Sequence, residues 1–275
     1  MIAGRRMNCG ERKDPGGTQV RRRVTRTVYV GPVSIGSGSP VVIQEMLPTP
    51  VRSAGDVKNA VKMIKRLEQA GCALVRVAVP DQESARLIGV IRERSGVPIV
   101  ADIHFYHRLA LEAIKSGADK IRINPGNIGS KKKVSEVAAA AKARGVPIRI
   151  GVNSGSLARE ILDKYSMTPQ ALVESCLREV ALLEGEGFED IVLSLKSTDV
   201  RLTVDANRLI AARVDYPLHI GITEAGFGTD GIIRSALGTG ILLAEGIGDT
   251  IRVSLSNGDR LENVKTCVRI MRALN

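Results

Sequence analysis

Five cationic side chains lie within or at the end of short apolar segments, where a permanent charge is unexpected. They are Arg76 in LVRVAV, Arg122 in KIRIN, Arg149 in PIRIGV, Lys196 in LSLK and Arg252 in TIRVSL. The acids available in comparable segments are Glu45, Asp102 and Glu224, with Asp190 and Asp249 at the starts of two segments. Because an unpaired buried charge costs at least several kcal/mol, the surplus of cations predicts a ligand that brings negative charge. For any single cation, the alternative is a salt bridge inside the protein.

The chemistry of Arg and Lys indicates what such a ligand contains. Arg presents a planar fork that matches phosphate oxygens, and Lys acts as a point charge. Several of these groups converging from different segments predict a ligand with more than one phosphate, such as a diphosphate. Neutral side chains beside them could bond phosphate or hydroxyl oxygens; these are Asn124, Asn127, Asn153, Ser154, Ser197, Thr223 and Ser254.

Acid–base chemistry has candidates in the same segments. Asp102 and His104 lie two residues apart on one face of a segment, and His219 and Glu224 share another segment. Glu224 or His104 could transfer a proton, and interior hydrogen bonding is the alternative for both. A metal site of Asp102, His104 and His219 is disfavoured, because no HxH or HExxH spacing supports it and five cations accompany it. We therefore expect no metal.

Eight short runs rich in β-branched residues alternate with helical stretches. The runs are 41–46, 73–79, 98–104, 120–124, 147–154, 190–197, 218–225 and 249–256. The first helical stretch, from Ser53 to Ala70, opens with the capping pattern Ser53-x-x-Asp56. Eight strand–helix units in series predict an α/β fold, a closed (β/α)8 TIM barrel with its site at the carboxyl ends of the strands. A doubly wound open sheet is the alternative.

The rest of the chain fits a single domain with a tail. Residues 28–40, VYVGPVSIGSGSP, predict a short hairpin at the bottom of the barrel, so the barrel and hairpin together span residues 27–275. Residues 1–26 contain +6 of the +11 net charge and show no hydrophobic period. They predict a disordered basic tail.

Composition argues against several classes of protein. Aromatic residues make up 3% of the chain, without a stacking stripe or a helix-turn-helix pattern, so we expect no nucleic-acid partner. No apolar run is long enough to span a membrane, and the amino terminus has no secretory signal, so we expect a cytoplasmic protein without a membrane partner. The four cysteines form no CxxC pair, which argues against a zinc site or an iron–sulfur cluster held by this chain alone; they are Cys9, Cys72, Cys176 and Cys267.

A resemblance to a known family rests on seven motifs, which together cover the region from about residue 24 to residue 275. The motifs are VRVAVP, VADIHF, IRINPGNIG, PIRIGVNSGSL, TPQALVES, PLHIGITEAG and LLAEGIGDTIRVSLS. The sequence resembles the 4-hydroxy-3-methylbut-2-enyl diphosphate synthases of the methylerythritol phosphate pathway of isoprenoid biosynthesis. The resemblance implies a barrel followed by a separate C-terminal domain with a [4Fe-4S] cluster on three Cys and a Glu. It also implies reduction of 2-C-methyl-D-erythritol 2,4-cyclodiphosphate to the linear allylic diphosphate, with electrons from flavodoxin or ferredoxin.

The resemblance also implies roles for individual residues. The diphosphate-binding cations would be Arg76, Arg122, Arg149, Lys196 and Arg252. Asn153 and Ser254 would be their hydrogen-bonding companions, and Glu224 would be the acid near the substrate hydroxyls, supported by Asp102 and His104.

The chain departs from the family pattern in two places. It ends where the barrel closes, so we expect no cofactor in this chain, a cluster supplied by a separate domain protein, and a homodimer. In addition, QEMLPTP (44–50) replaces the usual Gln-Ser-Met-Thr-Asn-Thr, which puts Glu45, Leu47 and Pro48 where small polar groups are expected. Two alternatives stay open: a non-catalytic paralogue that binds a diphosphate ligand, or a barrel enzyme of other diphosphate chemistry.

Overall fold

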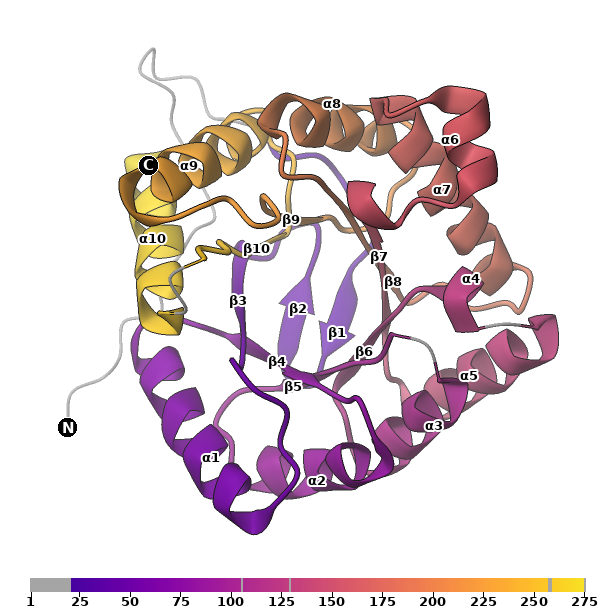
Figure 1. Ribbon diagram of the computed structural model, residues 1–275, viewed down its shortest axis with the longest axis vertical. Coiled ribbons are helices and arrows are strands. Elements are labelled where there is room, and N and C mark those ends of the chain that lie inside the picture. The colour runs from indigo at the N-terminus through magenta and orange to yellow at the C-terminus, as the bar shows by residue number, and fades with distance from the viewer. Residues whose placement is uncertain (1–20, 105, 129, 257–258, 275) are drawn as a thin grey trace.

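Eight parallel strands form a barrel at the centre of the molecule (Figure 1). The computed structural model describes residues 21–104, 106–128, 130–256 and 259–274. The barrel strands are β3 (Val42–Met46), β4 (Leu74–Ala78), β5 (Ile99–Asp102), β6 (Lys120–Ile123), β7 (Ile148–Asn153), β8 (Ile191–Lys196), β9 (His219–Ile220) and β10 (Thr250–Ile251). They pair in the order β8-β7-β6-β5-β4-β3-β10-β9, and a parallel bridge between Leu193 and Leu218 joins the two ends. The predicted (β/α)8 TIM barrel is confirmed.

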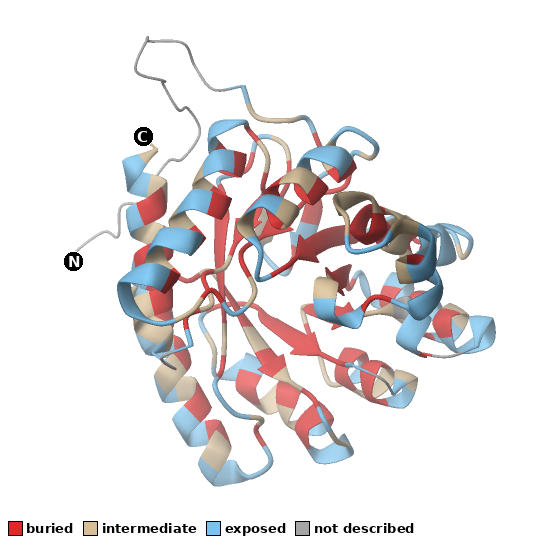
Figure 2. Ribbon diagram, turned by 45° about the horizontal axis from the view of Figure 1, so that its top comes forward, coloured by how far each residue is buried: buried red, intermediate tan, exposed pale blue. Residues whose placement is uncertain are grey.

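Helices surround the barrel and bury their apolar faces against it (Figure 2). They are α1 (Ala54–Gln69), α2 (Gln82–Glu93), α3 (His107–Lys115), α4 (Pro125–Ile128), α5 (Lys131–Arg144), α6 (Arg159–Tyr165), α7 (Pro169–Glu184), α8 (Val200–Ala211), α9 (Gly228–Ala244) and α10 (Arg260–Ala273). In α1 the Ser53 hydroxyl accepts a hydrogen bond from the backbone N–H of Asp56 at 3.1 Å, as the capping pattern predicts. Ile64 and Leu67 of that helix are fully buried. None of the described helices is both long and apolar enough to cross a membrane.

A two-stranded hairpin seals the bottom of the barrel, where the strands begin. It consists of β1 (Val28–Val30) and β2 (Val33–Ile35), paired antiparallel. Its buried side chains Val30 and Ile35 pack against Val42, Leu74 and Val100 inside the barrel. The predicted hairpin is therefore confirmed, and it leaves the opposite end of the barrel as the open one.

The chain before the hairpin is also held against the bottom of the barrel. Arg22 forms a salt bridge with Asp249 at 2.8 Å, and Arg26 forms one with Asp215 at 2.8 Å. Arg23 donates to backbone carbonyls, including that of Ala211 at 3.2 Å. The structure thus places residues 22–26 in contact with the barrel, whereas the sequence analysis included them in a tail. Residues 1–20 of that predicted tail lie outside the described residues.

Two strands are shorter than their patterns predict. β9 and β10 each contain two residues, although apolar runs continue through residues 225 and 256. A side chain at Gly221 would approach the backbone oxygen of Arg252 to 2.3 Å, so a glycine is needed where the two segments come close. Beyond these strands the chain continues as loops that still bond their neighbours, as in the Thr223 N–H donating to the Ser197 carbonyl at 3.0 Å.

Candidate functional site

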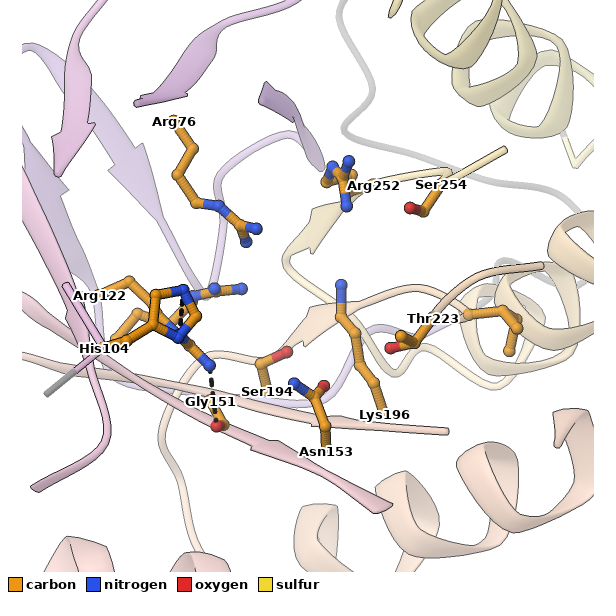
Figure 3. A pocket seen from close by; sticks show the side chains of 12 residues that line it. Arg76, His104, Arg122, Gly151, Asn153, Ser194, Lys196, Thr223, Arg252 and Ser254 are labelled. Atoms are coloured by element: carbon orange, nitrogen blue, oxygen red, sulfur yellow. Dashed lines mark hydrogen bonds between the residues drawn. The ribbon is translucent and has the colours of Figure 1, made fainter. Parts of the chain in front are cut away.

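The five predicted cations converge at the open end of the barrel. Strand periodicity explains this placement: Ile121 and Ile123 point outward into the core beneath the helices, so Arg122 between them points inward. Arg122 is paired in register with Arg149 on the next strand. The cavity is about 510 Å³ including its open mouth (Figure 3), and its lining is Arg76, His104, Arg122, Arg149, Gly151, Asn153, Ser194, Lys196, Ile222, Thr223, Arg252 and Ser254.

Asp102 neutralises one side of this cavity. Its buried carboxylate lies 3.3 Å from Arg76 Nε and 3.3 Å from Arg122 Nη1. Burial alone would raise the pKa of Asp102, but Arg76, His104 and Arg122 outweigh burial and hold that pKa well below its usual value. One carboxylate is thus shared between two guanidinium groups, and it fixes both.

Glu45 likewise neutralises a cation of the cavity, on the side where Arg252 lies. Its Oε1 atom accepts from Arg252 Nε and Nη2, both at 3.2 Å, and lies 3.8 Å from Nη1 of Arg260 at the start of α10. The Met46 N–H also donates to Oε1 at 2.8 Å. Glu45, predicted as a departure from the family pattern, is therefore fully buried as the partner of a cavity cation.

Arg149 and Lys196 are the cations without an acid. Both are buried, and neither side chain forms an ion pair within 4.0 Å or a hydrogen bond within the described part of the chain. Burial, with Arg76 and Arg122 nearby, holds the pKa of Arg149 well below its usual value. Burial, with Arg149 and Arg252 nearby, does the same to the pKa of Lys196. The cationic form of each side chain is thus costly until an anion arrives.

Neutral groups and glycines complete the cavity. Asn153 and Ser254, both predicted, line it together with Thr223 and Ser194. A side chain at Gly151 would come within 2.9 Å of Arg122 Nε, so the glycine leaves room for that guanidinium. Hydroxyls and an amide beside uncompensated cations suit the oxygens of a phosphorylated polyol.

The predicted acid–base residues separate in the structure. His104 lines the cavity, and its ring nitrogens lie 3.1 and 3.4 Å from Arg122 Nη1. Glu224 is exposed on the loop after β9 and is absent from the cavity lining, although its neighbour Thr223 belongs to it. Its φ of 48° is unusual for a residue other than glycine.

The three residues considered as metal ligands, Asp102, His104 and His219, do not form one group in the structure. His219 is fully buried deep in the barrel, where its Nδ1 lies 2.5 Å from the Thr250 hydroxyl. Nε2 of His104 lies 3.5 Å from Oδ2 of Asp102, beside the cavity at the mouth. Among the residues described, no group of three or more His, Cys, Asp and Glu side chains could hold a metal ion.

The described cysteines do not fit an iron–sulfur cluster either. Cys72, Cys176 and Cys267 are buried in the hydrophobic core. Burial raises the pKa of Cys72 and of Cys267 to about 12, and raises the pKa of Cys176. Cluster ligands are thiolates, and the hydrophobic surroundings of these three side chains favour the neutral thiol. Cys9 lies outside the described residues.

Sequence reasoning missed two cations near the site. Lys120 is fully buried two residues before Arg122, and its Nζ has no hydrogen-bond partner among the residues described. Strand periodicity could have found it, because residues two apart share a face. Arg260 could not have been found this way, because it reaches Glu45 from a helix 215 positions later in the chain.

The closed barrel and its cationic mouth define the class of protein: a TIM barrel whose candidate site gathers positive charge at the carboxyl ends of the strands. Residues 25–268 match the family profile described as "GcpE TIM-barrel domain". The chain belongs to this family, and the resemblance inferred from its motifs is confirmed.

Relatives in this family are named as enzymes. The chain is 53% identical over 254 residues to the 4-hydroxy-3-methylbut-2-en-1-yl diphosphate synthase (flavodoxin) of Caldanaerobacter subterraneus subsp. tengcongensis, covering 92% of this chain and 70% of that protein. It is 52% identical to the protein of the same name from Geobacter sulfurreducens, covering 91% of this chain and 70% of that one. The chain thus spans about 70% of the length of these relatives.

Solved structures of other proteins share the fold. The 3-dehydroquinate dehydratase of Geobacillus kaustophilus has a TM-score of 0.64 at 12% identity, with 92% of this chain and 99% of that chain covered. The Yersinia pestis dihydropteroate synthase has a TM-score of 0.63 at 12% identity, with 90% and 96% covered. At this level of identity the likeness concerns the barrel alone.

Proposed function

We propose that this barrel binds 2-C-methyl-D-erythritol 2,4-cyclodiphosphate for reductive ring opening to 4-hydroxy-3-methylbut-2-enyl diphosphate. The observation that supports this most is the pair of buried cations, Arg149 and Lys196, that face one cavity and form no ion pair with an acid among the described residues. Family membership supports the same ligand, because the relatives are named for the diphosphate product. A cyclic diphosphate supplies the two phosphates that a cavity with five cations can hold.

The other residues have roles that follow from their positions. Arg76, Arg122 and Arg252, fixed by their carboxylates, give the phosphates a rigid frame, and Asn153 and Ser254 bond the remaining oxygens. His104 lies at the cavity beside Asp102 and acts on the ligand from that side. Glu224 acts on the ligand hydroxyls from the rim, and its unusual backbone conformation supports a role beyond folding.

The reducing equivalents require a group that the residues described here do not hold. We propose a [4Fe-4S] cluster on a separate C-terminal-type domain, contributed by another chain, with flavodoxin or ferredoxin as electron donor. We further propose that the barrel works as a homodimer in the cytoplasm. The flavodoxin named for the relatives supports the choice of donor.

Two measurements test the proposal. Calorimetric titration of the protein with the cyclodiphosphate should give saturable binding that is stronger than binding of inorganic pyrophosphate at equal ionic strength. Turnover with a reductant should then require a full-length relative whose own barrel has been inactivated at the arginine that matches Arg149. Absence of cyclodiphosphate binding would overturn the function, whereas binding without turnover in the mixture would overturn only the proposed source of the cluster.

A further inference from the structure

One carboxylate oxygen, Oε1 of Glu45, links the cavity to a cation outside it. Arg252 lines the cavity, and Arg260 belongs to α10 behind it. Both guanidinium groups approach the same oxygen, Arg252 at 3.2 Å and Arg260 at 3.8 Å. The second oxygen, Oε2, is buried and accepts no hydrogen bond from the residues that the structure describes. The negative charge of Glu45 is therefore shared between one cation that can touch a ligand and one that is outside the lining.

This sharing sets the electrostatic potential of the mouth. Five cations line the cavity, and the carboxylates that pair with them are those of Asp102 and Glu45. The negative charge of Glu45 lowers the positive potential of the mouth close to Arg252. The positive charge of Arg260, outside the lining, partly offsets that decrease. At such distances in a partly desolvated site, one charge changes the affinity for an anion strongly.

We propose that Glu45 is a specificity-determining residue that limits how much negative charge the mouth retains, with Arg260 setting the strength of that limit. The inference rests on the proposed function and deepens it. A cyclic diphosphate has one ionisable oxygen on each phosphorus. Ring opening to a linear diphosphate frees a terminal phosphate with one further ionisation near neutral pH. By weakening the field of Arg252, Glu45 lowers affinity for the more highly charged linear product relative to the cyclic substrate.

The test uses inorganic anions of increasing charge, so that it does not depend on the cyclodiphosphate. Phosphate, pyrophosphate and tripolyphosphate are titrated at constant ionic strength into the wild type, Glu45→Gln, Arg260→Gln and the double variant. Glu45→Gln should bind pyrophosphate about fivefold more tightly and steepen the rise of affinity with ligand charge, and Arg260→Gln should bind it about threefold more weakly. The double variant should return close to the wild type, because removing one negative and one positive charge together leaves the net charge beside the mouth unchanged.

A matched control separates this effect from a general change of charge. Glu245 pairs with Arg208 on the exterior, 2.5 Å away, so Glu245→Gln removes the same charge without touching the mouth. It should leave pyrophosphate affinity unchanged. Melting curves of all variants report folding independently of binding.

The outcomes are distinguishable. A purely structural role predicts that both single variants lose affinity together with thermal stability, and that result would overturn the proposal. If Glu45→Gln does not fold, Arg260→Gln still decides, because unchanged affinity in that variant contradicts the proposal. Opposite shifts with pyrophosphate but no binding of the cyclodiphosphate would support the role of Glu45 as a charge limiter and reject the proposed substrate. Failure of the wild type to bind any of these anions would reject both.

Discussion

Both ends of the barrel contain buried or half-buried arginines with bonding partners, but only the mouth also contains buried cations without an ion-pair partner among the described residues. At the bottom, Arg22 is paired with Asp249, Arg26 with Asp215, and Arg23 with backbone carbonyls. At the mouth, Arg149 and Lys196 have no such partner within the described chain. The arginines at the bottom therefore stabilise the fold, whereas Arg149 and Lys196 at the mouth are free to contact an anion.

The difference agrees with how barrels divide stability and function between their ends. The bottom is sealed by the β1–β2 hairpin and by residues 22–26, whose charged groups bond to the barrel. The mouth instead has Gly151 and Gly221 at positions where a larger residue would collide with Arg122 or Lys196. Space and uncompensated charge occur together there, and this combination distinguishes a binding site from a structural ion pair.

The largest expected effect comes from breaking a satisfied pair at the mouth. Asp102→Asn leaves Arg76 and Arg122 without their shared carboxylate and should lower the free energy of unfolding by about 3–5 kcal/mol at neutral pH. Because the pKa of Asp102 is held low in the folded state, its contribution is complete above the unfolded pKa near 4 and is lost as the pH falls below it. Urea denaturation should therefore show a smaller difference in the free energy of unfolding between wild type and variant at pH 3 than at pH 7. An equal difference at both pH values would contradict this reading.

A smaller effect of a different kind is expected for an unsatisfied cation. Arg149→Met should weaken binding of the cyclodiphosphate by about 1.5–3 kcal/mol, since a hydrogen-bonded charge contact is lost. It should leave the melting temperature unchanged or raise it, because an uncompensated buried charge is removed. Calorimetric titration and thermal melting of the same sample measure both. A variant that loses stability without losing affinity would place Arg149 with the structural cations.

The matching change at the bottom sharpens the contrast. Arg23→Ala removes donors to the carbonyl groups beneath the barrel and should lower the free energy of unfolding by about 1–2 kcal/mol. Ligand affinity should stay at the wild-type value, because the site lies at the other end. Urea denaturation measures the loss of stability, and calorimetric titration measures the ligand affinity. A loss of affinity equal to that of Arg149→Met would remove the distinction between the two ends of the barrel.

The last effect concerns Lys120, which lies between the two ends, and it is a change in the pH dependence of stability. Burial, with Arg149 and Arg76 nearby, lowers the pKa of Lys120 to about 7. Between pH 7 and about 10 the unfolded chain holds a proton that the folded protein has released, so this residue makes stability rise with pH by up to about 1.4 kcal/mol per unit. Lys120→Met should remove that rise. Melting temperatures from pH 6 to 9 that rise equally in both proteins would show that Lys120 is not its source.

Much of this arrangement could be predicted from sequence because it depends on short repeating patterns. Alternating strands and helices gave the barrel, and the two-residue period of strands brought Arg76, Arg122 and Arg149 to one face. Contacts between distant segments could not be predicted: Arg260 meets Glu45 through the closure of the barrel, and no local pattern connects them. Loop conformation was equally inaccessible: the sequence predicted Glu224 as an acid near the substrate hydroxyls, but not that its side chain would be exposed on the loop after β9.

The most direct test of the unsatisfied cations is a crystal structure of the protein with the cyclodiphosphate bound. We predict phosphate oxygens within hydrogen-bond distance of Arg149 and Lys196 at the mouth, with Arg76, Arg122 and Arg252 still paired to Asp102 and Glu45. A ligand bound elsewhere, or an Arg149 and a Lys196 that remain without contact to it, would contradict the account.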